Sequence, residues 1–275
     1  MKKRLATYHN KQINVIRGLK DDEYTLLNEH IVRIREFEMN YRRINYIAQA
    51  LKDLNVLMSD RLNKSIKPSD FDTKLYINII SFLTLFRTFL DHWETYIKRT
   101  YGNKSLEVTK FKDSTSLEYD RSFSYRFIYE LRNFSIHCDI PLDNVNMKLN
   151  EETEEKTINI FANRDQLLTV YDWKLVIKRD LLVGPPNIDL YEHFESVIES
   201  VINIQRVAIN LCDTRKLLEA AMGILKIKEE NSMASDFIII EYTGLNKDSK
   251  PENINIEHIP IEFATYVITN ILKIK

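Results

Sequence analysis

Three residue types that can act on a phosphodiester lie close together near residue 135. Arg132 is followed directly by Asn133, and four residues separate Arg132 from His137. An imidazole titrates near neutral pH, so it can act as a general base toward a ribose 2′-hydroxyl or as a general acid toward the leaving 5′-oxygen. A guanidinium can stabilise the charge of the transition state, and an amide can orient the imidazole or the phosphate. These residue types therefore suit phosphodiester chemistry, and that chemistry requires no metal.

Helix geometry determines which of these side chains can meet. On an ideal helix Arg132 and His137 lie about 140° apart and do not stack on each other, whereas Asn133 and His137 are in i,i+4 positions and can meet. Tyr125 and Tyr129 share the stripe of Arg132 and are supporting candidates. An alternative reading is that the three polar residues only cap carbonyls and hold the following loop.

The Arg-x4-His spacing is not selective by itself. It occurs at Arg4–His9, Arg87–His92 and Arg132–His137, and roughly one Arg–His pair with four to six intervening residues is expected by chance. We expect the first pair in a frayed terminus and the second in the middle of an aromatic helix stripe, where a packed histidine is the simpler account. The third pair lies at a helix end, shortly before Pro141, which sets it apart from the other two.

The string Leu-Arg-Asn-Phe-Ser-Ile-His at residues 131–137, followed by Pro141 and Leu142, resembles the helix-end segment of the HEPN superfamily. The resemblance covers about residues 71–215. It implies a helical bundle that pairs as a homodimer, with two Arg/His sets in one cleft, and a metal-independent endoribonuclease without a cofactor. The products would carry a 2′,3′-cyclic phosphate and a 5′-hydroxyl. By analogy with relatives, it also implies a toxin or phage-defence setting with an antitoxin or regulatory partner.

The resemblance adds two supporting candidates and has one departure. Family members often place an acid on the preceding helix, which indicates Asp91 and Glu94, although a surface salt bridge is the simpler reading of both. One HEPN subset has a tyrosine two residues after the histidine. Here that position is Asp139, so regulation by AMP transfer is not supported. The rival hypothesis is a non-catalytic HEPN scaffold for RNA binding or protein interaction.

Apolar periodicity predicts a mainly α-helical fold. Helices are expected at 21–64, as one helix or as two with a break near Glu38–Asn40, and at 71–100, from about 115 to 137, 189–212, 213–229 and 261–273. Residues 101–115 are polar and predict a loop, with Thr115 in a capping-box position for the next helix. Alternating runs near residues 145–149 and 157–161 predict a β-hairpin, and the runs at 237–242 and 253–261 predict a second strand pair.

These elements suggest an N-terminal helical segment, a HEPN-like domain and a C-terminal extension. The helical segment covers residues 1–65, and the HEPN-like helical domain covers 66–229 with a small β-hairpin insertion at about 145–177. Residues 230–275 form a short α+β element. A chain of 275 residues suffices for one large domain or two small ones.

Composition excludes several classes of protein. The chain has 5 glycines and neither glycine-rich phosphate-loop motif, which argues against a nucleotide-binding loop. Cys138 and Cys212 have no C-x-x-C spacing, so neither a zinc site nor a disulfide framework is indicated. A net charge of -1 provides no global attraction to nucleic acid, so RNA binding would need a local patch. The absence of a secretory signal and of a long apolar run predicts a cytoplasmic protein without a membrane span.

Overall fold

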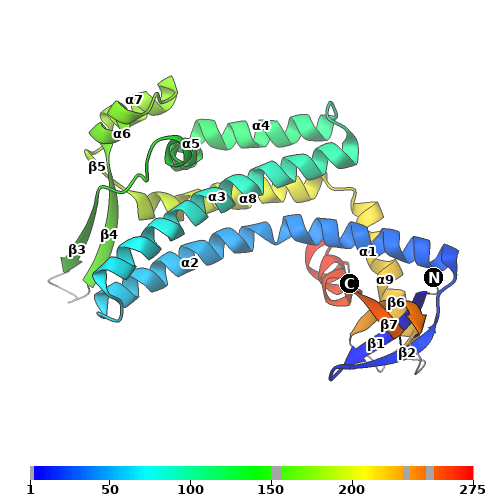
Figure 1. Ribbon diagram of the computed structural model, residues 1–275. Coiled ribbons are helices and arrows are strands. Elements are labelled where there is room, and N and C mark those ends of the chain that lie inside the picture. The colour runs from blue at the N-terminus through cyan, green and yellow to red at the C-terminus, as the bar shows by residue number, and fades with distance from the viewer. Residues whose placement is uncertain (1–2, 150–155, 232–235, 246–250, 275) are drawn as a thin grey trace. The chain divides into compact units, whose positions relative to one another are not determined.

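The computed structural model describes residues 3–149, 156–231, 236–245 and 251–274. The fold is mainly α-helical with two small sheets, which confirms the predicted fold class (Figure 1). The chain divides into two compact units. Unit 1 combines Met1–Met39 with Cys212–Lys275, and unit 2 is Asn40–Leu211. Among the described residues, no helix is both long and apolar enough to cross a membrane.

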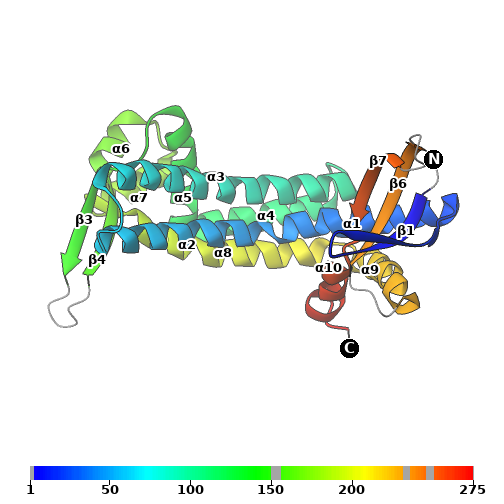
Figure 2. The same cartoon turned by 60° about the horizontal axis from the view of Figure 1, so that its bottom comes forward.

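The core of unit 2 is a bundle of helices. Its main members are α2 (Arg43–Leu62), α3 (Pro68–Tyr101), α4 (Leu106–Arg121), α5 (Phe123–His137) and α8 (Leu190–Leu211). Figures 1 and 2 show α2, α3, α4 and α8 alongside one another, and α3 and α8 each contact α2, α4 and α5. The predicted aromatic stripe of α3 is fully buried at Phe82, Phe86, Phe89 and Trp93. This stripe gives α5 an apolar surface on which to pack.

The predicted β-hairpin insertion contains more helix than expected. Strands β3 (Asn144–Leu149) and β4 (Lys156–Asn163) pair antiparallel, as predicted, and β5 (Asn187–Asp189) extends the sheet to the order β3-β4-β5. Between β4 and β5 lie the short helices α6 (Arg164–Val170) and α7 (Leu175–Val183). Asn163 begins α6 because its side chain accepts hydrogen bonds from the amides of Asp165 and Gln166.

Unit 1 combines the two ends of the chain in one sheet. Its strands are β1 (Lys3–His9), β2 (Gln12–Gly18), β6 (Phe237–Leu245) and β7 (Pro251–His258), in the order β2-β1-β6-β7 with antiparallel neighbours. The unit also contains α9 (Thr214–Glu230), α10 (Ile261–Tyr266), the π-helical turn η1 (Val267–Ile271) and most of α1 (Asp21–Tyr41). The strand pair predicted near the C-terminus and the final helix are therefore confirmed.

Three local predictions were wrong. The single helix expected from about 115 to 137 is divided at Ser122, where α4 ends and α5 begins. Residues 3–18 form a β-hairpin rather than a frayed terminus; Asn10 and Lys11 have φ of 49° and 64°, as a two-residue hairpin turn requires. Residues 106–115 belong to α4 rather than a loop, because Ser105 caps the helix by accepting from the Val108 amide at 3.3 Å. Thr115 therefore lies inside α4 and does not cap a helix.

The units also differ from the predicted three-part division at residues 65 and 229. β1 pairs with β6, which joins residues 3–7 to residues 237–241. Pairing over such a sequence separation leaves no local pattern, so the two ends of the chain were expected to be separate segments. The helical N-terminal segment is thus shared, with α1 mostly in unit 1 and α2 in unit 2.

His193 is a half-buried histidine that should make the stability of the protein depend on pH. It lies on α8 in edge-to-face contact with the rings of Phe123 and Phe127, and its Nδ1 is 2.8 Å from the Ser124 hydroxyl. Burial lowers the pKa of His193 below the ordinary 6.5, against a smaller raising effect of Glu192 and Asp189. Below pH 6.5 the unfolded chain therefore binds a proton that the folded chain refuses.

We expect the free energy of unfolding of the wild type to fall as the pH drops below about 6.5. His193→Gln keeps a hydrogen-bond acceptor for Ser124 but cannot titrate, so its stability should fall less over the same range. Urea denaturation of both proteins between pH 8 and pH 5 measures this difference. Parallel pH dependences would show that His193 makes no contribution.

Candidate functional site

Helix α5 carries most of the predicted site residues, and its ends are well defined. Ser122 caps it by accepting from the Tyr125 amide at 3.2 Å. Phe127, Leu131 and Phe134 are buried, as predicted, and hold the helix on the bundle. His137 is the last residue of the helix. The apolar face thus leaves Arg132, Asn133 and His137 on the remaining, more polar surface.

Arg132 and Asn133 belong to one hydrogen-bonded chain. Arg132 Nη1 donates to Asn133 Oδ1 at 3.4 Å, and Asn133 Nδ2 donates to Glu130 Oε2 at 3.3 Å. Arg132 has no carboxylate partner within the described part of the chain, and its buried Nε has no hydrogen-bond acceptor there. Arg132 thus retains a positive charge that no carboxylate of the described residues neutralises.

Glu130 is the buried acid at the end of this series of hydrogen bonds. Its side chain is only 3% exposed, and its carboxylate contacts Lys174 Nζ at 2.6 Å and accepts from the Tyr119 hydroxyl at 3.5 Å. The hydrogen bond to Glu130 raises the pKa of Lys174, against a smaller desolvation effect. Because the Lys174 ammonium neutralises the Glu130 carboxylate, Glu130 does not require the positive charge of Arg132 as well.

Two of the predicted supporting residues join the same region through Arg87. Arg87 Nε donates to Asp91 Oδ2 at 3.0 Å, and the Arg87 guanidinium lies 4.7 Å from the Tyr129 ring centroid. Tyr125 is 1% exposed, and its ring packs against Tyr129. Burial raises the pKa of Tyr125 far above its usual range, so its phenol stays protonated. The structure therefore places Asp91, Tyr125 and Tyr129 in one connected cluster.

The structure does not bring every predicted site residue together. His137 is exposed, and no hydrogen bond joins it to Arg132 or Asn133 within the residues described; Asn133 instead turns toward Glu130. Glu94 pairs with Lys98 at 2.7 Å and with Lys112 at 3.5 Å, which makes it a member of a separate ion-pair group. Within the described ranges, no cluster of three or more His, Cys, Asp or Glu side chains forms a potential metal site.

Three residues of this network were missed by the sequence analysis. Glu130 left a usable signal, because a carboxylate next to Leu131 on a buried helix face requires a partner. Tyr119 lies in α4, and no local pattern indicates that its hydroxyl reaches Glu130 of α5. Lys174 is the N-cap residue of α7, and no local pattern indicates that it reaches α5.

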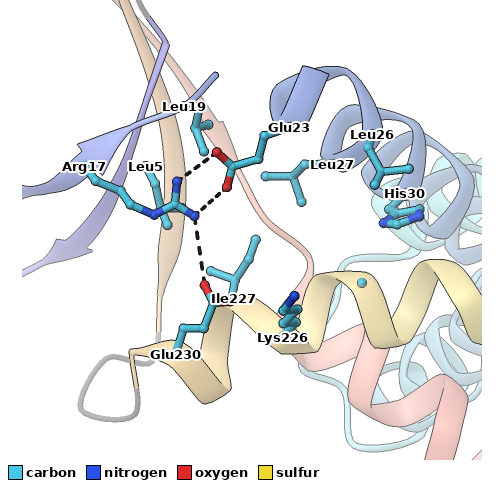
Figure 3. Close-up of a pocket in the computed structure, with 11 residues that line it drawn as sticks. Leu5, Arg17, Leu19, Glu23, Leu26, Leu27, His30, Lys226, Ile227 and Glu230 are labelled. Atoms are coloured by element: carbon cyan, nitrogen blue, oxygen red, sulfur yellow. Dashed lines mark hydrogen bonds and ion pairs between the residues drawn. The ribbon is translucent and has the colours of Figure 1, made fainter. Parts of the chain in front are cut away.

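A separate cavity of about 190 Å³ lies in unit 1 (Figure 3). Arg17 makes a two-pronged ion pair with Glu23, with Nη1 and Oε2 2.9 Å apart, and lies 3.9 Å from Glu230. Figure 3 shows the three charged groups on one side and His30 on the other. Gly223 of α9 lies directly against the His30 ring, where a Cβ atom would overlap it.

Because of this close contact, the effect of Gly223→Ala on stability should change sign when His30 is replaced by alanine. Gly223→Ala should destabilise unit 1 by about 1 kcal/mol, because the overlap with His30 outweighs the gain in helix propensity. With His30→Ala already present, the same change should instead stabilise by about 0.5–1 kcal/mol. Urea denaturation of the four proteins of this cycle measures the coupling. Equal effects in the two backgrounds would contradict the contact.

The likeness of residues 131–137 to the HEPN helix-end segment rests on the residues of this chain alone. The segment is helical up to His137, as that likeness requires, but many helices end in this way. The membership of the chain in the superfamily therefore stays a prediction. No family model matches the chain, and neither a curated protein nor a solved structure matches it.

Proposed function

We propose that this protein is a metal-independent endoribonuclease in which Arg132 binds the scissile phosphate and His137 transfers the proton. The observation that supports it best is the unneutralised guanidinium of Arg132, five positions before an exposed histidine on the same helix. Asn133 is a positioning residue, because it links Arg132 to the anchored Glu130. The resemblance to HEPN proteins supports the same assignment and motivates a toxin or phage-defence setting.

The atoms and protons of the proposed reaction balance with the ribose 2′-hydroxyl, the phosphate and histidine side chains alone. His137 accepts the proton of a 2′-hydroxyl while the 2′-oxygen attacks phosphorus, and the bond from phosphorus to the 5′-oxygen breaks. Arg132 stabilises the additional negative charge on the phosphoryl oxygens. The leaving 5′-oxygen needs a proton, which a second His137 would supply if two copies of the chain line one cleft. The products are a 2′,3′-cyclic phosphate and a 5′-hydroxyl.

The test is cleavage by the purified chain in EDTA. Wild type and His137→Ala are incubated with single-stranded and structured RNAs, and the termini of the products are analysed. Cleavage by the wild type alone, with cyclic-phosphate and 5′-hydroxyl ends, is the expected result. Equal cleavage by both proteins would exclude His137 from the reaction.

One observation favours a second candidate function. No hydrogen bond joins His137 to Arg132 or Asn133 among the residues described, so a single chain does not link the predicted trio. A non-catalytic module that binds RNA or another protein through the Arg132 charge needs no such assembly. This alternative predicts RNA binding without cleavage by the wild type, and binding that weakens in Arg132→Ala.

A further inference from the structure

Arg43 and His92 form a hydrogen-bonded pair in unit 2 that the proposed reaction does not use. Arg43 begins α2, and His92 belongs to α3, which runs alongside α2 in the opposite direction (Figure 1). Arg43 Nη2 lies 2.8 Å from His92 Nδ1. His92 is exposed, although the aromatic stripe of α3 indicated a packed histidine. The buried positions of that stripe are Phe89 and Trp93, and His92 lies beside them at the surface.

The guanidinium of Arg43 carries a positive charge that lacks a counter-ion. Arg43 is half-buried, and no carboxylate forms an ion pair with it among the residues described. Burial lowers the pKa of Arg43, against a smaller raising effect of Tyr46, and no acid contributes. Its Nε is buried and its Nη2 contacts His92, so Nη1 is the nitrogen that reaches solvent. A cation that is partly removed from water is favoured by a nearby anion, which indicates an anionic ligand.

The hydrogen bond to Arg43 determines which nitrogen of His92 carries the proton. A guanidinium only donates, so Nδ1 of His92 accepts and the neutral ring carries its hydrogen on Nε2. Burial lowers the pKa of His92 below the ordinary 6.5, and Arg43 and Arg99 lower it as well, against the raising effect of Asp91. The ring is therefore neutral at pH 7, and within the described ranges no acceptor is hydrogen-bonded to its Nε2. His92 thus adds a free donor, on an exposed side chain, to the charge of Arg43.

Arg99 extends this positive surface along α3. It is exposed and has no ion-pair partner in the described part of the chain. Arg99 follows His92 by seven residues, so the two lie within about 20° of each other around the helix and about 10 Å apart along it. Tyr46, one turn after Arg43 on α2, is also exposed and offers a ring on which a base can pack. The charges are thus spread along the helices, which suits a strand with several phosphates better than one small anion.

We propose that Arg43, His92 and Arg99 form a surface that binds the phosphate backbone of an RNA strand. This inference rests on the proposed function, since it names a second contact with the same substrate. The phosphates held here are not the one that is cleaved, because Arg132 and His137 belong to a different helix, α5. A chain with a net charge of -1 needs such a local positive surface in order to bind RNA.

The test is binding of a fluorescent single-stranded RNA to the full chain, measured by anisotropy over a series of salt concentrations. Every protein carries His137→Ala, so that the RNA stays intact. Arg43→Met and Arg99→Ala should each weaken binding about tenfold, the lower end of the effect of a hydrogen bond to a charged group. Each should also reduce the slope of log K against log salt by about one. Arg99 is exposed, so Arg99→Ala decides the test if Arg43→Met fails to fold.

The chain provides a matched control on the same helix. Lys52 is exposed and lies nine positions after Arg43, which places it about 180° around α2 from Arg43. Lys52→Met removes the same charge by the same replacement as Arg43→Met. It should bind RNA with the affinity and the salt slope of the reference protein. A loss equal to that of Arg43→Met would show an effect of net charge alone and would overturn the surface.

The outcomes separate this surface from the nuclease activity. Weaker binding and a smaller salt slope in Arg43→Met and Arg99→Ala support the surface even if the wild type cleaves no RNA, in which case only the proposed function fails. If the wild type cleaves RNA but these variants bind it like the reference protein, the surface is overturned and the function stands. Absence of RNA binding by the reference protein also overturns it. A poly-glutamate peptide that binds as tightly as RNA, and less tightly to Arg43→Met, would replace RNA with an acidic protein as the partner.

Discussion

Replacing His137 with alanine is expected to reduce the rate of RNA cleavage by about a hundred- to ten-thousandfold, the usual contribution of one general acid–base group. His137 is exposed at the end of α5, and its side chain makes no hydrogen bond or ion pair within the described residues, so its loss should not affect folding. The measurement is a single-turnover rate in EDTA at saturating protein. An unchanged melting temperature would show that the rate reports on chemistry.

The chain provides a matched control for this substitution. His9 follows Arg4 with the same four-residue spacing but lies at the exposed end of strand β1. His9→Ala should therefore leave the cleavage rate unchanged. If His9→Ala and His137→Ala lower the rate equally, neither histidine acts in the specific manner proposed, and an effect on the whole chain must be responsible.

Substitutions of Arg132 test its role in binding the phosphate separately from the proton transfer at His137. Arg132→Ala should lower the rate by about a hundredfold or more through the loss of transition-state stabilisation. Arg132→Lys keeps the charge but loses the paired donors, so its rate should lie between those of alanine and arginine. If Arg132→Ala cleaves at the wild-type rate while His137→Ala does not, the phosphate is bound elsewhere.

Much of the helical fold could be predicted because its signals are local. The aromatic stripe of α3 and the apolar face of α5 repeat at helical spacing, and each was found buried. The helix α4 was missed at its start because residues 104–111 are largely polar, and only Val108 and Phe111 are buried in that part. A solvent-facing helix with so narrow an apolar stripe resembles a loop in composition.

The β1–β2 hairpin of unit 1, by contrast, could not be predicted, because its signals are not local. Its turn residues, Asn10 and Lys11, both adopt positive φ without a glycine, so the usual hairpin dipeptide is absent. The hairpin is also stabilised by pairing of β1 with β6, more than two hundred positions later in the chain. Neither feature is visible in a short window, which explains why the N-terminus was expected to be frayed.

The residue types of the candidate site could be predicted from the sequence, but the hydrogen bonds between them could not. Arg132 and Asn133 do contact each other, but Asn133 turns toward Glu130 and not toward His137 as i,i+4 spacing allowed. The reason is the buried carboxylate, which requires donors and takes them from Asn133 and Lys174. Because Lys174 comes from another element, only the tertiary structure reveals which donors are available.

The second large expected effect concerns this Glu130–Lys174 pair. Lys174→Met should lower the free energy of unfolding by about 2 kcal/mol, because it leaves a carboxylate that is 3% exposed without its charged partner. Loss of one partner of a fully buried pair typically costs about 3–5 kcal/mol. The smaller value reflects Lys174, whose side chain is 61% exposed and already partly solvated.

A double-mutant cycle isolates the pair from other effects of the methionine. Glu130→Gln removes the charge but keeps the shape and an acceptor for Asn133, so it should cost only about 1 kcal/mol. In the Glu130→Gln background Lys174→Met should cost almost nothing, which gives a coupling of about 1–2 kcal/mol by urea denaturation. Lys178→Met, at another exposed lysine of α7, is the control and should change stability by less than about 0.5 kcal/mol. Additive effects of Glu130→Gln and Lys174→Met would mean that Lys174 does not neutralise Glu130.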